Sequence, residues 1–329
     1  MAEHLKSTLE AGLTSSPKYI PTWYNYDEIG SELHHKYTTG NSGNNYFTRS
    51  QLSIIQDNIQ DIIPRTPHGL TIVDLGSGNC TKTRLFIDEL LRRQQKCSFY
   101  PVDISSEFLL KSVSKLTREY GDALSITPIP ADYEQGIEHL KRVEGPKLIL
   151  FFASIINLSY DEQVDTLRMI STMMTDECRL VFSADATQDR DVILKAYNDD
   201  AGQARTFLQN VITRLNREEG SQIDMNMFVL EVDFISDTSS QNMSYIRVCI
   251  QAKESVMYPI PGLGIELTME KGERLYFHKG AGYSCKYTKE QLQTIVEKAG
   301  LHLEDTWTDE HQRAIFCRCK IVNDTNVLS

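Results

Sequence analysis

The chain has 329 residues, of which 40% are hydrophobic and 24% are charged. These proportions are ordinary for a globular protein and exclude a collagen-like, coiled-coil or wholly disordered chain. The 45 acidic residues outnumber the 34 basic ones, so the formal charge is -11. A surface of this charge disfavours nucleic acid and anionic membranes as partners.

Cysteine spacing and hydropathy indicate a cytoplasmic protein without a metal. The seven cysteines include no C-x-x-C pair, and Cys317 and Cys319 lack the spacing of a zinc knuckle. We therefore expect free thiols in a reducing compartment. The first residues lack the apolar segment of a signal peptide, and the longest apolar run, residues 148–156, is far shorter than the ~20 residues that span a membrane. We expect no bound metal, no membrane contact and a monomer.

The first 60 residues are polar and rich in aromatic side chains. Residues 38–45, rich in glycine and asparagine, have the composition of a flexible loop. Two interpretations are open here. The aromatic residues beside the loop form a lid over a pocket, or the region is a helical extension packed on the body of the protein.

From residue 70 onward, strand-like and helix-like patterns alternate. Amphipathic helical stretches separate apolar, β-branched runs, which lie at 70–78, 98–105, 124–133, 147–158 and 178–186. The predicted helices are 81–94, 107–121 and 161–174. This alternation predicts an α/β fold with a doubly wound, Rossmann-like sheet.

After residue 191 the alternation stops. Residues 191–219 predict two helices with a break near 199–202, and strand-like stretches follow up to residue 287. The terminal segment predicts a helix and a hairpin that complete the first sheet. We therefore expect a Rossmann-like lobe of residues 61–190 plus 286–322, and a second, α+β lobe of residues 1–60 plus 191–285.

Three predicted strands end in residues suited to bind adenosine. These residues are Gly76, Ser77 and Gly78 after the first strand, Asp103 after the second, and Asp132 with Tyr133 after the third. Ligands of open α/β sheets bind beyond the carboxyl ends of the strands. Glycine there lets the backbone approach a ligand, an acid can accept ribose hydroxyls, and an aromatic ring can stack on adenine. The ordinary alternative for each acid is a helix cap. The set predicts a nucleoside site, and S-adenosylmethionine is the common cofactor with this profile.

Long stretches of the chain, among them VDLGSGNCTKTRLFIDEL, SIINLS and KAYNDDAG, resemble the histidine Nα-methyltransferase family of the ergothioneine pathway. The resemblance covers nearly the whole chain and is greatest to the family's fungal tryptophan-methylating branch. It implies a Rossmann-like lobe that binds S-adenosylmethionine and an α+β lobe that binds the amino-acid substrate. It also implies successive methylation of an α-amino group up to a trimethylated betaine.

The resemblance implies roles for individual residues at the cofactor. Gly76, Ser77 and Gly78 would approach its methionine part, Asp103 its ribose, and Asp132 with Tyr133 its adenine. Lys82 would help to seat the cofactor. Arg49 would lie on a lid, although Phe47 stands where the family usually has proline.

At the substrate, the resemblance implies that Tyr26 orients the amine by a hydrogen bond. Asn157 and Tyr197 would hold the carboxylate, because a carboxylate needs fixed donors. Phe207 would form a wall near the reacting nitrogen, and Ser284 would line the pocket.

Two departures from the family pattern bear on the substrate. Gly282 stands where the histidine enzymes have a glutamate that bonds the imidazole, and Val248 stands where the family tends to have methionine. Both changes enlarge the pocket and lower its polarity, which favours the larger indole. The segment that ends at Ser284 is about four residues longer than the family pattern, which offers His278 or Tyr283 as a replacement partner.

We therefore expect iterative methylation of L-tryptophan to its N,N,N-trimethyl betaine. The alternative substrate is L-histidine. An alternative of another class is a non-catalytic, methyltransferase-like binding protein.

Overall fold

The computed structural model describes residues 2–39, 45–66, 69–237, 239, 243–280 and 283–322. The contacts within the chain divide it into two units. The α+β unit comprises Met1–Asn45, Gln188–Asp237 and Ser244–Cys285. The Rossmann-like unit comprises Tyr46–Thr187, Thr238–Met243 and Lys286–Ser329.

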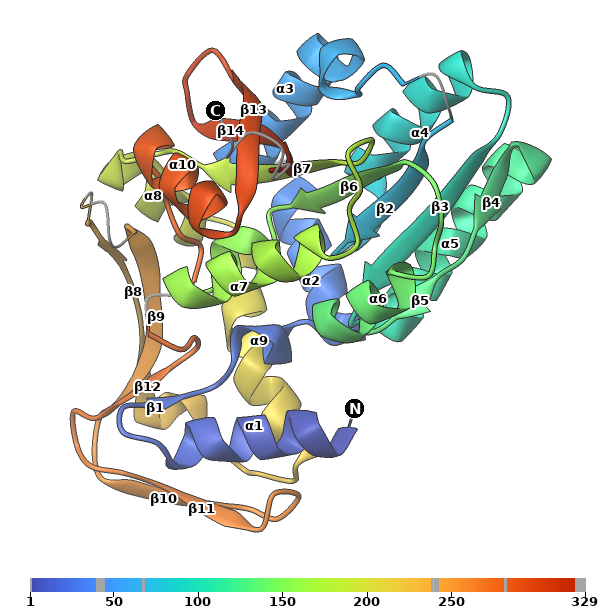
Figure 1. Cartoon of the computed structure of the whole chain (residues 1–329). Coiled ribbons are helices and arrows are strands. Elements are labelled where there is room, and N and C mark those ends of the chain that lie inside the picture. The colour runs from blue at the N-terminus through green and yellow to red at the C-terminus, as the bar shows by residue number, and fades with distance from the viewer. Residues whose placement is uncertain are drawn as a thin grey trace. The chain divides into compact units, whose positions relative to one another are not determined.

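A mostly parallel sheet forms the centre of the Rossmann-like unit (Figure 1). Its strands are β2 (Thr71–Leu75), β3 (Cys97–Asp103), β4 (Leu124–Ile126), β5 (Ile129–Pro130), β6 (Lys147–Phe152), β7 (Arg179–Asp185), β13 (Leu301–Thr308) and β14 (Ala314–Ile321). They lie in the order β13-β14-β7-β6-β2-β3-β4, with β5 paired to β3. Strands β2 to β7 pair in parallel, whereas β14 is antiparallel to both β7 and β13. The predicted α/β sheet and its closing hairpin are therefore confirmed.

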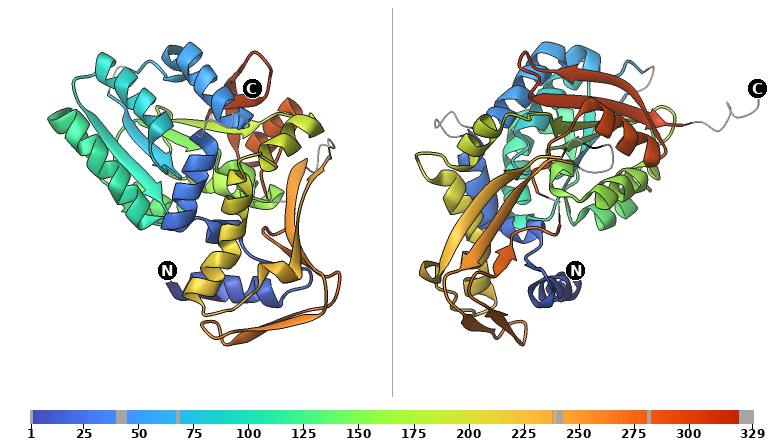
Figure 2. Two further views of the ribbon diagram at one scale, coloured as in Figure 1. Left: turned by 180° about the vertical axis from the view of Figure 1, so that it is seen from behind. Right: turned by 90° about the vertical axis from the view of Figure 1, so that its left-hand side faces the viewer.

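Helices cover this sheet on both sides (Figure 1 and Figure 2). Successive residues of a strand point to opposite faces, and both faces are apolar here: Ile72 and Leu148 are buried on one, Val73 and Ile149 on the other. The first face packs against α3, α4 and α5, and α6, α7 and α10 pack against other elements of the unit. The helices are α3 (Tyr46–Ile62), α4 (Thr81–Arg93), α5 (Ser106–Tyr120), α6 (Tyr133–Leu140), α7 (Tyr160–Ser171) and α10 (Lys289–Lys298), with the short η2 (Gly121–Ala123) and η3 (Ile155–Asn157).

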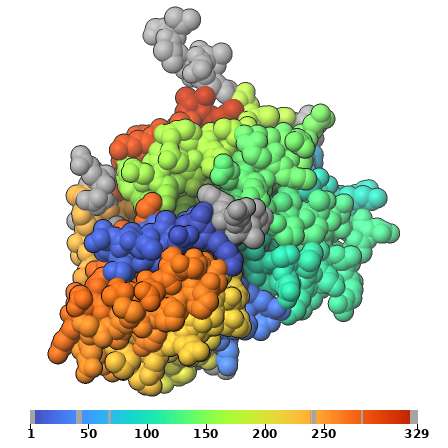
Figure 3. Space-filling view, turned by 90° about the horizontal axis from the view of Figure 1, so that it is seen from below, coloured from blue at the N-terminus to red at the C-terminus, as the bar shows by residue number. Residues whose placement is uncertain are grey.

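In the α+β unit, the described residues form a four-stranded sheet, a separate hairpin and four α-helices. Its strands are β1 (Lys18–Tyr19), β8 (Phe228–Ile235), β9 (Tyr245–Ala252) and β12 (Arg274–Tyr276) in the sheet, and β10 (Val256–Ile260) and β11 (Ile265–Met269) in the hairpin. The sheet order is β1-β12-β9-β8. The helices are α1 (Ala2–Thr14), α2 (Glu28–Thr39), α8 (Arg190–Tyr197) and α9 (Gln203–Glu218), with the short η1 (Thr22–Asn25) and η4 (Met225–Met227). Helix α1, blue in Figure 3, lies beside the orange β10–β11 hairpin and buries Leu9 and Leu13.

Several boundaries differ from those expected from the sequence. Helix α3 clusters with the Rossmann-like unit, whereas we expected residues 46–60 in the other lobe, because Ile54 and Ile55 are buried in the core of the sheet. The strand predicted at 147–158 ends at Phe152, because Ala153 has a left-handed backbone (φ 60°) and the chain turns into η3. Among the described residues, no helix is long and apolar enough to cross a membrane.

Candidate active site

The turn after β2 has a backbone that only glycine tolerates well. Gly76 has φ 79° and Gly78 has φ 53°, values at which an L side chain is strained. A Cβ atom on Gly76 would also lie 2.4 Å from the Oγ atom of Ser154. No described residue has an atom within 4 Å of a Cβ built on Gly78, so that side of the turn is open toward the described part of the chain. The Ser77 hydroxyl closes the turn by donating to the carbonyl oxygen of Asp74, at 2.9 Å.

Asp103, at the end of β3, is hydrogen-bonded to this turn. One carboxylate oxygen accepts the N–H of Gly78 at 2.8 Å, and the other accepts the N–H of Ser105 at 2.9 Å. Burial raises the pKa of Asp103, and the two backbone N–H groups oppose that shift. Beside it, the buried Ser105 hydroxyl has no hydrogen-bond partner among the described residues. The predicted grouping of the turn with Asp103 is therefore present, next to a polar atom that a ligand hydroxyl can satisfy.

Asp132 and Tyr133 begin helix α6. An Asp132 carboxylate oxygen accepts the N–H of Gln135 at 2.9 Å, so this acid caps the helix, the ordinary alternative for such a position. Burial raises the pKa of Tyr133 to about 12, and the nearby Asp103 and Asp74 carboxylates add to that shift. The Tyr133 hydroxyl lies 3.3 Å from the Cβ position of Gly76. Tyr133 is thus brought to the glycine turn.

Two further residues at this edge of the sheet are not in the predicted site. Asp74, the last polar residue of β2, is buried and accepts the hydroxyl of Thr83, and burial raises its pKa to about 6. Gln51 on α3 accepts from the Lys82 ammonium at 3.1 Å and donates to the hydroxyl of Ser183 at 2.6 Å. Gln51 was not predicted, because its two partners lie far away from it along the chain.

Lys82 lies in the first turn of α4, within the predicted helix, whereas Arg49 lies on α3 and Asn157 lies in η3 rather than at the end of a strand. Burial lowers the pKa of Lys82 to about 8, and the Asp74 carboxylate opposes the shift. Arg49 is exposed on α3, and its role at the cofactor stays a prediction. Asn157 ends η3, close after β6 and half-buried, with its N–H bonded to the carbonyl oxygen of Ser154 at 3.2 Å.

In the α+β unit, aromatic rings from three segments form one cluster. The Tyr26 ring lies 5.6 Å from that of Phe207 and 5.4 Å from that of His34. Tyr37 stacks on Phe207 at 6.3 Å, with its ring almost parallel. Offset and edge-on aromatic contacts of this kind stabilise a packed group of rings. Tyr26 and Phe207, predicted from distant stretches of sequence, are therefore neighbours.

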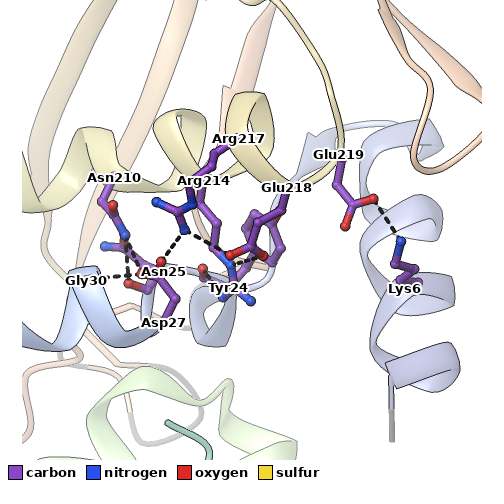
Figure 4. A network of polar contacts seen from close by, with 10 residues as sticks. All are labelled: Lys6, Tyr24, Asn25, Asp27, Gly30, Asn210, Arg214, Arg217, Glu218 and Glu219. Atoms are coloured by element: carbon purple, nitrogen blue, oxygen red, sulfur yellow. Dashed lines mark hydrogen bonds and ion pairs between the residues drawn. The ribbon is translucent and has the colours of Figure 1, made fainter. Parts of the chain in front are cut away.

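A network of polar contacts joins the segment around Tyr26 to helix α9, which carries Phe207. Figure 4 shows Asn25, Asp27 and Asn210 of this network. Asn25, next to Tyr26, donates to the carbonyl oxygen of Phe207 at 3.1 Å, and Asn210 donates to the carbonyl oxygen of Asn25 at 3.2 Å. Asn210 also donates to Asp27 at 2.9 Å. Although burial raises the pKa of Asp27, hydrogen bonds from its neighbours hold the value below the ordinary range. The charged carboxylate thus helps to tie η1 and α2 to α9.

The other predicted substrate residues of this unit divide into three cases. The Tyr197 hydroxyl, at the end of α8, donates to the Ser284 hydroxyl at 2.5 Å. Val248 is fully buried in β9. Gly282 lies outside the described residues. Tyr283 was named only as a replacement partner; it is buried and its ring stacks on that of His278.

The comparisons with known proteins decide the family. A family model described as "Histidine-specific methyltransferase, SAM-dependent" matches residues 5–321. This chain belongs to that family. The family member described here is therefore an S-adenosylmethionine-dependent N-methyltransferase of amino acids, with an α/β methyltransferase fold and an additional sheet lobe.

Curated relatives of this histidine-specific methyltransferase family member carry different names. The chain is 28% identical to a "Histidine N-alpha-methyltransferase" of Mycolicibacterium smegmatis, over 94% of this chain and 92% of the relative. It is 26% identical to the protein of that name from Mycobacterium tuberculosis, over 93% and 91%. It is 22% identical to "4-dimethylallyltryptophan N-methyltransferase easF" of Epichloe festucae var. lolii, over 94% and 93%.

The residues of the Rossmann-like unit fit the family's cofactor. The open side of Gly78 and the unpartnered hydroxyl of Ser105 flank the Asp103 carboxylate, which can accept ribose hydroxyls. S-adenosylmethionine supplies an electrophilic methyl group on a sulfonium. Among the described residues, no group of three or more His, Cys, Asp or Glu side chains is placed to hold a metal ion.

Proposed function

We propose that this protein methylates the α-amino group of an aromatic L-amino acid. The observation that carries the proposal is the aromatic cluster of the α+β unit, in which the rings of Tyr26 and Phe207 pack together. A flat apolar ring packs favourably among such side chains. The chain also belongs to a family of amino-acid methyltransferases.

The proposed roles follow the chemistry of each group. Tyr26 would hydrogen-bond the amine and orient its lone pair, and it would not act as a strong base because a tyrosine titrates near ~10. Asn157 and Tyr197 would hold the substrate carboxylate, and Phe207 and Ser284 would line the ring site. Positioning and exclusion of water, which keep the amine neutral and aligned, contribute most to such a transfer.

For the cofactor, the proposed contacts keep the roles expected from the sequence. Gly76, Ser77 and Gly78 would approach the methionine part, and Asp103 would bind the ribose. Asp132 and Tyr133 would bind the adenine. Lys82 and Arg49 would complete the cofactor site.

Histidine is the first candidate substrate. The family model is described as histidine-specific, and the two mycobacterial relatives named for histidine have higher identity to this chain than the relative named for a tryptophan derivative. The comparisons thus favour histidine over the tryptophan that we expected from the sequence.

Tryptophan is the second candidate, because one structural observation favours it. Val248 is fully buried and is smaller than methionine, which leaves more volume for an indole. Tyr283, which the sequence offered as a replacement partner, carries a phenol, and its ring stacks on an imidazole. A phenol does not favour a charged imidazolium as a carboxylate does.

A competition assay tests the proposal. Equal concentrations of the natural aromatic amino acids and histidine are incubated with the protein and isotopically labelled S-adenosylmethionine, and the methylated products are quantified by mass spectrometry. We expect a labelled Nα-methyl product from histidine or tryptophan. Label on a ring nitrogen, or on no amino acid, would refute the proposed function.

A further inference from the structure

The segment after β12 departs from regular pairing with β9. In this antiparallel ladder Tyr276 pairs with Cys249, and the same register, if continued, would place Lys279 opposite Ile246. Instead, the N–H of Ile246 donates to the carbonyl oxygen of Tyr283 at 3.0 Å. The chain therefore rejoins β9 four residues late (283 instead of 279). The extra length noticed in the sequence is thus a loop-out from one strand.

The His278 imidazole replaces a backbone hydrogen bond that the β9–β12 ladder loses at this loop-out. Its Nε2 atom accepts the N–H of Val248 at 3.2 Å, in place of the Phe277 carbonyl that a continuous ladder would use. Its Nδ1 atom lies 2.6 Å from the carbonyl oxygen of Gly280. A carbonyl only accepts, so Nδ1 carries the hydrogen and donates it. Both ring nitrogens of His278 are hydrogen-bonded to backbone groups. His278 therefore does not replace the substrate-binding glutamate of the histidine enzymes.

The loop-out ends at Tyr283, which directly precedes Ser284, and the Ser284 hydroxyl accepts a hydrogen bond from that of Tyr197. The Tyr283 ring stacks on that of His278, with centroids 5.9 Å apart and planes 21° apart, and the residue is buried. Burial raises the pKa of Tyr283 well above its ordinary value, and the phenols of Tyr197, Tyr26 and Tyr37 add to that shift. The Tyr37 hydroxyl already donates to the Ala196 carbonyl oxygen at 3.1 Å, and that of Tyr197 donates to a serine. Tyr283 therefore brings a neutral phenol to the residues proposed to surround the substrate.

We propose that Tyr283, held in place by His278, is a specificity-determining residue that hydrogen-bonds the ring nitrogen of a neutral aromatic substrate. The proposal rests on the proposed function and names how the ring would be recognised. A phenol can donate and accept one hydrogen bond, which suits an indole N–H or a neutral imidazole. A benzene ring offers it no partner, so phenylalanine gains nothing from the hydroxyl.

The test compares wild type with Tyr283→Phe on tryptophan, histidine and phenylalanine. We expect kcat/KM for the preferred substrate with a ring nitrogen to fall about tenfold, the loss of one hydrogen bond. We expect kcat/KM for phenylalanine to change less than about twofold, and the Kd for S-adenosylmethionine to stay the same. An equal change for all three amino acids, or no change, would overturn the role of Tyr283.

A pair of His278 variants separates positioning from general folding. Glutamine has an oxygen that can accept from the Val248 N–H and an NH₂ group that can donate to the Gly280 carbonyl oxygen. His278→Gln should therefore keep the wild-type substrate ratio, which is kcat/KM for the preferred substrate divided by kcat/KM for phenylalanine. His278→Ala removes both bonds and should lower that ratio as Tyr283→Phe does. A His278→Ala protein with the wild-type ratio would show that His278 does not position Tyr283.

Binding distinguishes a failure of this inference from a failure of the proposed function. If wild type methylates none of the three amino acids, the proposed function fails. The role of Tyr283 is then decided by calorimetry, in which the same amino acids are titrated into wild type and Tyr283→Phe with S-adenosylhomocysteine present. We expect Tyr283→Phe to bind the preferred amino acid with a ring nitrogen about tenfold more weakly and to bind phenylalanine as wild type does. Equal binding of each amino acid by both proteins, or no binding, would refute it.

Discussion

The candidate residues of the two units are brought together in different ways. In the Rossmann-like unit, Gly78 and Asp103 meet because each follows the carboxyl end of one of two adjacent parallel strands. In the α+β unit, Tyr26 and Phe207 come from helical segments far apart in the chain and are joined by side-chain hydrogen bonds to backbone groups. Topology alone places the first pair, whereas particular side chains place the second. Substitutions should therefore affect cofactor binding in one unit and substrate choice in the other.

The largest effect is expected at the cofactor residue that topology places. Asp103→Ala should raise the Kd for S-adenosylmethionine at least about 100-fold, because hydrogen bonds to a charged group contribute roughly 1.5–3 kcal/mol each. Calorimetry measures the affinity, and circular dichroism checks that the sheet is intact. The matched control is Asp122→Ala, which removes an exposed acid of the same charge. Wild-type affinity in Asp103→Ala would contradict the assignment.

A somewhat smaller and more selective effect is expected at Asn157. Asn157→Ala should raise the Kd for the amino acid roughly 10- to 100-fold, because a bound carboxylate loses one donor. The Kd for S-adenosylmethionine should change less than about twofold. Equal losses for both ligands would indicate local misfolding of the segment after β6 rather than a substrate contact.

The same assignment predicts the behaviour of decarboxylated substrates. Tryptamine and histamine lack the group that Asn157 and Tyr197 are proposed to hold, so both should be methylated far more slowly than their parent amino acids. Product formation followed by mass spectrometry is the measurement. Efficient methylation of either amine would contradict the carboxylate assignment for both residues.

The difference between the two units also explains what the sequence could predict. The order of strands and helices and the cluster of Gly76, Gly78 and Asp103 follow from periodicity and from the geometry of parallel sheets. Gln51 could not be foreseen, since its contacts with Lys82 and a β7 serine depend on how α3 packs.

The loop-out after β12 was visible in the sequence only as extra length. Nothing in the residue types showed that His278 would bond the backbone of Val248 and Gly280 rather than face a ligand. That outcome depends on the register between two strands, which is a three-dimensional property. Gly282 lies outside the described residues, so its role at the substrate stays a prediction from the sequence.

Val248 offers a test of substrate choice at an intermediate magnitude. Val248→Met adds bulk at a fully buried position of β9, so kcat/KM for tryptophan should fall about tenfold relative to histidine. Val229→Met, on the neighbouring strand β8, is the matched control because Val229 is 46% exposed. A ratio of tryptophan to histidine turnover that is the same in both variants would show that Val248 does not limit the size of the substrate.

The last expected effect is on stability rather than on activity, and it depends on acid. Burial lowers the pKa of His278 from 6.5 to about 4, so the unfolded chain binds a proton between these values while the folded chain does not. The contribution of His278 is therefore fully present above about pH 6.5 and declines as the pH falls toward 4, by at most about 1.4 kcal/mol per pH unit. Denaturant unfolding of wild type and His278→Gln at pH 7.5 and pH 5 measures it. Glutamine keeps both backbone bonds but does not titrate, so the variant should lose less stability than wild type on acidification. Identical losses in the two proteins would mean that the imidazole at this position is not held neutral.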